Sequence, residues 1–123
     1  WRFTAKTKVP KDKGNQHLYG IEIESLGTSS HIDGSDEGMT LEQVISTAML
    51  SAALLNAMAP SSLSRAVTRV IRHRDWTPRK SDVKQDLDWW REAIRIAKKN
   101  KGDKAKTREK ITEFVEKHNR GRL

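Results

Sequence analysis

The chain has no cysteine among its 123 residues, and this absence excludes several kinds of chemistry. There can be no disulfide framework and no thiol nucleophile. A zinc site built on thiolates is excluded as well, so any bound metal ion would need histidine, aspartate or glutamate ligands.

Long apolar runs and a secretory leader are also missing. We find no apolar run of the roughly 18 residues that a transmembrane helix needs. Residues 1–13 are polar and basic, without the apolar centre of a signal peptide. We therefore expect no membrane span, and synthesis in the cytoplasm without a visible signal peptide. The length allows one domain at most.

Positive charge is abundant but unevenly placed. Lysine and arginine number 24 against 16 acids, which gives a net charge of +8, and residues 98–123 hold ten of those cations against four acids. This shift in composition predicts a boundary after Ala97. We expect a domain over residues 1–97 and a basic linker with an amphipathic helix over residues 98–123.

Within residues 1–97, two segments have the alternating polarity or the residue composition that is typical of strands. In residues 18–24 (LYGIEIE), Ile21 and Ile23 share one face while Glu22 and Glu24 share the other, which predicts a strand. Residues 63–72 are rich in β-branched side chains and predict a short buried strand that ends at His73.

Helices are expected in three places. Thr40 and Gln43 form a capping-box pattern ahead of apolar residues spaced by three and four, which predicts a helix from Thr40 to Leu55 that Pro60 stops. Residues 83–98 carry an apolar stripe. A last amphipathic helix is expected to begin with Thr107 as its N-cap.

The segment from His73 to Asp82 (HRDWTPRKSD) holds the most informative polar residues. A histidine at a strand end, a proline turn and then Lys80 and Asp82 would bring an imidazole, an ammonium and a carboxylate to one rim of the sheet. Imidazole and carboxylate both suit zinc. On spacing alone, a surface turn with a solvated salt pair explains these residues better than a metal site does. The other histidines, His17, His31 and His118, are expected to be structural or solvated.

Three pieces of the chain, spanning about residues 15–97, occur in the order of a known family. They are Asn15 followed by Tyr19-Gly20-Ile21-Glu22, the helix from Thr40 to Leu55, and Val70-Ile71-Arg72-His73 through Arg79-Lys80-Ser81-Asp82. In these pieces the chain resembles the zinc-dependent N-acetylmuramoyl-L-alanine amidases, which include phage endolysins and peptidoglycan recognition proteins. The closest likeness is to endolysins of phages that infect actinobacteria.

The resemblance implies a mixed α/β fold with a central sheet flanked by helices, and hydrolysis of the amide between N-acetylmuramic acid and L-alanine at the bacterial cell wall. It implies Zn²⁺ as cofactor and peptidoglycan as partner, with His73 and Asp82 as metal ligands. It also implies that Lys80 stabilises the oxyanion and that Glu22 is the general base. Residues 1–97 would then be the carboxyl portion of the catalytic domain.

The chain departs from the family pattern in two ways. Arg72 stands where the family has glycine, and the interval between His73 and Asp82 is one residue shorter than usual. The family's first metal histidine lies on an early strand that has no counterpart in this sequence, and Arg2 follows Trp1 where the family has a histidine in its substrate-side stretch. We therefore expect the chain alone to bind zinc poorly and to have little activity, unless an amino-terminal segment or a second chain completes the site.

Two other functions fit the sequence. One is a non-catalytic peptidoglycan-binding domain. The other is a small basic nucleic-acid-binding protein, which the basic tail suggests. The tail, however, interleaves acids with its cations and has Phe114 as its only aromatic residue, so nucleic acid is the less favoured partner.

Overall fold

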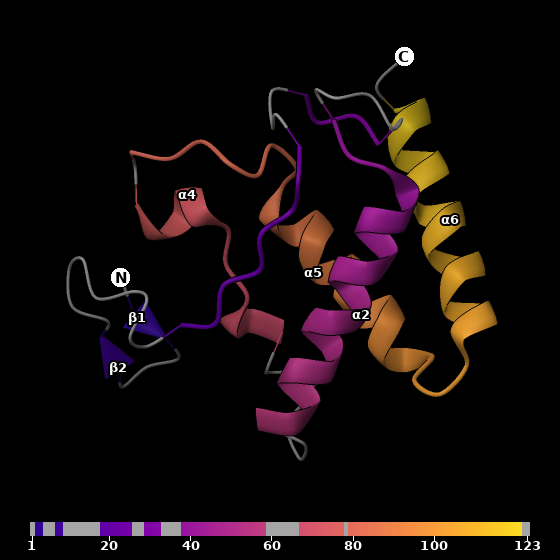
Figure 1. The fold of residues 1–123 in the computed structure, drawn as a ribbon, viewed down its shortest axis with the longest axis horizontal. Helices are drawn as coiled ribbons and strands as arrows, with labels where there is room; N and C mark the ends of the chain where they lie inside the picture. Colours follow the sequence, from indigo (N-terminus) through magenta and orange to yellow (C-terminus); the bar gives the residue numbers. More distant parts are fainter. Residues whose placement is uncertain are drawn as a thin grey trace.

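The computed structural model describes residues 2–3, 7–8, 18–25, 29–32, 38–58, 67–77 and 79–121. Three helices dominate these residues and pack against one another (Figure 1). They are α2 (Leu41–Met58), α5 (Leu87–Lys99) and α6 (Lys104–Arg120). Shorter elements complete the described fold: β1 (Arg2–Phe3), β2 (Thr7–Lys8), η1 (Val67–Arg69) and α4 (His73–Trp76).

The predicted α/β fold with a central sheet is wrong. The described residues contain one antiparallel pairing, in which Arg2 faces Lys8 and Phe3 faces Thr7, and no sheet between the helices. Residues 18–24 are extended but pair with no strand. The second predicted strand is also absent where the structure describes it, because Val67–Arg69 forms a 3₁₀ turn packed on α5. Residues 70–72 are described and form no strand, and residues 63–66 of that segment lie outside the described residues.

Helix α2 begins where the capping box predicts. The Thr40 hydroxyl accepts a hydrogen bond from the Gln43 backbone N–H at 3.0 Å, and the Gln43 side chain accepts one from the Thr40 N–H at 2.9 Å. The pair satisfies two backbone donors that a helix start leaves free. The predicted helix is therefore confirmed, and it extends to Met58, three residues beyond the expected Leu55. Pro60 lies outside the described residues.

The two later helices start at other residues than predicted. Helix α5 begins at Leu87, four residues later than expected. Helix α6 begins earlier, because Asp103 is its N-cap and accepts from the Lys106 backbone N–H at 2.9 Å. Thr107, the predicted cap, is instead buried in the first turns, where its hydroxyl donates to the Asn100 and Asp103 carbonyls.

The core lies where α2, α5 and α6 meet. Val44, Ile94 and Ile111, one from each helix, are fully buried there, and Val67 of η1 is buried beside them. Trp89 stacks on Phe114 with ring centroids 5.2 Å apart, and Trp90 meets Trp89 edge to face. Trp90 is buried in the core, and Trp89 is partly buried against it.

Within the described ranges, α2 is the one helix long and apolar enough to cross a membrane by length and composition. Its buried residues (Val44, Ile45, Ala48, Ser51, Ala52 and Leu55) pack toward α5 and α6. The core helix of a soluble protein passes the same test of length and composition, so this helix is consistent with the expected lack of a membrane span.

Candidate functional site

The predicted site residues His73 and Asp82 lie next to each other. His73 Nδ1 and Asp82 Oδ2 are 3.1 Å apart, and both side chains are about half exposed, at 45% and 50%. The Arg74 backbone N–H also donates to the Asp82 carbonyl at 2.9 Å. The loop from 73 to 82 is therefore closed at its base by one backbone contact and one side-chain contact. The expected proximity is present, but His73 is the first residue of the short helix α4 and does not lie at the end of a sheet strand.

Arg72 and Asp75 hold this loop in shape. The Arg72 guanidinium donates to both carboxylate oxygens of Asp75, at 2.9 and 2.8 Å, and its third contact is the Gln85 carbonyl at 3.2 Å. The Arg72 backbone N–H donates to the same carboxylate at 2.8 Å. These bonds cap α4 and tie it to the chain that enters α5.

The Arg72–Asp75 pair also shifts the pKa of both side chains. Hydrogen bonds from Arg72 are the main reason that the pKa of Asp75 lies below its usual value, and the carboxylate raises the pKa of Arg72 in return. Both groups therefore stay charged around neutral pH. The pair was not expected from the sequence, where Arg72 is only a departure from a family glycine, although an arginine three residues before an aspartate is the spacing of such a pair.

Lys80 belongs to the same loop as His73 and Asp82. Its backbone N–H donates to the Thr77 carbonyl at 3.2 Å, and its side chain is exposed. In the part of the chain that the structure describes, the ammonium group has no hydrogen-bond or ion-pair partner. Lys80 is thus close in the chain to the histidine and aspartate, with a side chain free to approach a ligand.

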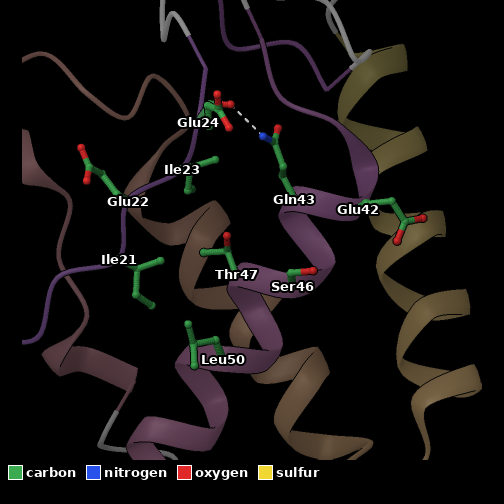
Figure 2. A pocket seen from close by; sticks show the side chains of 9 residues that line it. All are labelled: Ile21, Glu22, Ile23, Glu24, Glu42, Gln43, Ser46, Thr47 and Leu50. Atoms are coloured by element: carbon green, nitrogen blue, oxygen red, sulfur yellow. Dashed lines mark hydrogen bonds between the residues drawn. The ribbon is translucent and has the colours of Figure 1, made fainter.

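Glu22 is placed on a different surface. It lies on the extended segment that runs along α2, where a shallow groove of about 320 Å³ is lined by Ile21, Glu22, Ile23, Glu24, Glu42, Gln43, Ser46, Thr47 and Leu50. Figure 2 shows Ile21 and Ile23 directed toward α2 and the Glu22 carboxylate directed away from it. The Gln43 side chain donates to the Glu24 carbonyl at 2.7 Å and holds the segment on the helix.

The donor atoms of His73 and Asp82 fit a metal such as zinc. Zinc binds imidazole nitrogen and carboxylate oxygen at about 2.0 to 2.2 Å, so two ligand atoms of a tetrahedral site lie about 3.3 Å apart. The observed separation of 3.1 Å is close to that value. Across the described ranges, however, no third histidine, aspartate or glutamate joins them in a group that could hold a metal ion. The structure thus brings together two side chains of the kinds that bind zinc, whereas a catalytic zinc needs three protein ligands.

The other histidines take different positions. The His118 ring nitrogen Nε2 lies 3.0 Å from the Ser30 carbonyl oxygen, and its ring packs against Trp89. The backbone of His31 accepts from the Met39 N–H and donates to the Ser29 hydroxyl. His118 thus joins α6 to the 29–32 segment, and His17 lies outside the described residues.

Comparison of the chain with protein-family models, curated proteins and solved structures finds no match.

Proposed function

We propose that this chain acts on peptidoglycan as a zinc-dependent amidase, in which His73 and Asp82 are two of the metal ligands. The observation that supports the proposal is the 3.1 Å approach of His73 Nδ1 to Asp82 Oδ2 across a loop that also carries Lys80. The bond to be cleaved is the amide between N-acetylmuramic acid and L-alanine, as the motif resemblance implies.

The residues of the loop have separate roles in this proposal. A zinc ion bound there would supply Lewis-acid polarisation of the substrate carbonyl and activation of water near neutral pH. Asp82 and His73 would hold the ion, and Lys80 would donate to the oxygen on which negative charge develops. Glu22 lies beside α2 and outside this loop. Its role as general base therefore rests on the resemblance alone and stays a prediction.

Zinc binding is the first test. Histidine ring signals of the 123-residue chain can be followed by NMR as Zn²⁺ is added, with His31 and His118 as internal controls. We expect weak binding that perturbs the His73 ring signals and leaves those of His31 and His118 unchanged. The binding should be weak because only two ligands are in place. His73→Ala and Asp82→Ala should each abolish the response. Equal perturbation of all histidines, or unchanged binding by the variants, would refute the proposed ligands.

Cleavage chemistry is the second test. Amidase action on purified peptidoglycan exposes new L-alanine amino groups and creates no new sugar reducing ends. We expect slow, zinc-dependent release of amino groups that His73→Ala abolishes. Lys80→Ala should keep zinc binding and lower turnover about 100-fold, as is typical when one transition-state donor is removed. New reducing ends, or peptidoglycan binding without any zinc-dependent cleavage, would contradict the amidase and favour a glycosidase or a non-catalytic binding domain.

A further inference from the structure

The turn between α5 and α6 concentrates positive charge. Lys98 and Lys99 end α5, Lys101 lies in the turn, and Lys104 and Lys106 begin α6. With Asp103 as the only acid, residues 98–106 carry a net charge of +4, half of that of the whole chain. Figure 1 shows this turn at the end of α6 opposite the C-terminus. We refer to these five lysines as the turn patch.

The lysines of the turn patch have no acidic partners. On α6, Arg108 pairs with Glu42, and Lys110 lies 3.9 Å from Glu113. Counting the residues that the structure describes, none of the five lysines forms an ion pair. Residues 101–106 are all exposed. The charge of the turn patch is therefore available to an external anion.

The backbone that carries the patch is well fixed. The buried Thr107 hydroxyl donates to the Asn100 carbonyl at 3.2 Å and to the Asp103 carbonyl at 2.9 Å. The Asn100 side chain donates to the Ile96 carbonyl at 2.8 Å, and Gly102 has a φ of +88°, which favours glycine. Binding an anion at the patch would thus require ordering of lysine side chains but little ordering of the chain itself.

The shape and composition of the patch indicate the kind of anion. Residues 98–113 contain no aromatic side chain, so the bases of a single-stranded nucleic acid would have no surface there on which to stack. The patch is a short turn between two helices. A DNA duplex, with a persistence length of about 50 nm, stays nearly straight over a turn of this size and presents its phosphates to one side of the turn. A flexible chain of phosphodiesters can fold around it and place several phosphates near the lysines.

We propose that the turn patch binds a flexible polyol-phosphate polymer of the bacterial cell wall through its phosphates. The choice of a wall polymer rests on the proposed function at peptidoglycan, whereas the presence of an anion-binding patch does not. Binding there would hold the chain at the wall independently of the His73–Asp82 loop. The tests below use neither zinc nor cleavage, so their failure is distinguishable from failure of the proposed amidase.

The test measures binding of purified polyglycerol phosphate by calorimetry between 50 and 200 mM salt. Each phosphate contact adds about 0.7 to 0.9 to the slope of log K against log salt concentration, if the polymer behaves as nucleic acids do. Five contacts predict an affinity loss of about 100- to 500-fold over this range. The triple variant K101Q/K104Q/K106Q, left with two lysines, should lose only about tenfold over the same range and bind more weakly at 50 mM salt.

A matched control removes the same charge elsewhere. The variant R69Q/K117Q/R120Q changes three exposed cations outside the patch and should keep the parent's salt dependence, with circular dichroism confirming that both variants fold. An equal loss in both variants would show diffuse attraction and overturn the proposal. So would tighter binding of a DNA duplex at equal phosphate concentration, or binding that needs anionic lipid vesicles.

Discussion

Arg72 illustrates how one side chain determines local structure in this molecule. It caps α4 by its bonds to Asp75, and it reaches the Gln85 carbonyl where the chain enters α5. The positions of His73 and Asp82 follow from this, because the first directly succeeds Arg72 and the second accepts from the Arg74 backbone. A glycine at position 72 would lack all three side-chain contacts. Arg72 is thus a positioning residue for the candidate site.

The pH dependence of stability should report on the Arg72–Asp75 pair. Because the pKa of Asp75 is lower in the folded chain than in the unfolded one, its carboxylate stabilises the fold above a pH of about 4 and loses this effect as the pH falls through the folded pKa. Asp75→Asn should therefore lower the free energy of unfolding by about 1 to 2 kcal/mol at pH 7. Urea unfolding at pH 7, 5 and 3 should show this difference shrinking toward acid.

A control for this prediction lies on α6. Glu116 is exposed there, and Glu116→Gln should change the free energy of unfolding by less than about 0.5 kcal/mol at each pH. A loss for Asp75→Asn that stays constant from pH 7 to pH 3 would mean that the carboxylate charge does not contribute.

At the scale of elements, local signals predicted helices better than strands. The capping box at Thr40 forms within four residues and needs no distant partner, so the start of α2 follows directly from the sequence. A strand needs a second strand for its hydrogen bonds. Residues 18–24 keep the predicted alternation, with Ile21 and Ile23 toward α2 and Glu22 away from it. Their packing partner is a helix, and sequence alternation cannot distinguish a helix from a neighbouring strand.

The predicted strand at residues 63–72 and the predicted start of the last helix also differ from the structure. Val67 and Val70 favour a strand by side-chain shape, yet burial of Val67 against α5 is satisfied by a single 3₁₀ turn. The segment after Asp103 is rich in strong helix formers, so α6 starts a turn before the expected Thr107 cap. For the site, sequence spacing predicted the approach of His73 to Asp82. The spacing of Arg72 and Asp75 also fits an ion pair, but only in a helical turn, and the expected strand end at His73 excluded such a turn.

The capping box gives a direct test at this scale. Thr40→Ala removes the hydroxyl that accepts from the Gln43 N–H, and we expect it to lower the free energy of unfolding by about 1 kcal/mol. Thr40→Ser keeps an acceptor at the same place and should restore most of the loss. Urea denaturation followed by circular dichroism measures both changes. An equal loss for alanine and serine would assign the effect to the threonine methyl group and not to the cap.

At the scale of the whole molecule, the basic C-terminal helix is part of the packed core. Helix α6 packs against both α2 and α5. Its Asn119 side chain clamps the backbone of Ile32, accepting from its N–H at 3.3 Å and donating to its carbonyl at 3.0 Å. Deleting residues 98–123 would therefore expose the apolar faces of the other helices. Charge substitutions on the intact chain are the sounder way to examine what the basic residues bind.

Ile111 tests this role of α6 most directly. Its side chain is fully buried where α6 meets the other two helices, so Ile111→Ala removes apolar contacts and leaves a cavity that the rigid neighbours fill only in part. We expect the free energy of unfolding to fall by about 2 to 5 kcal/mol, with one cooperative transition and an unchanged dependence on urea. The exposed Glu113→Ala on the same helix should change it by less than about 0.5 kcal/mol.

If α6 were an independent appendage, Ile111→Ala would melt that helix alone and leave the transition of α2 and α5 where it was. A single shifted transition, seen both by circular dichroism and by tryptophan fluorescence, is the outcome that the packing predicts.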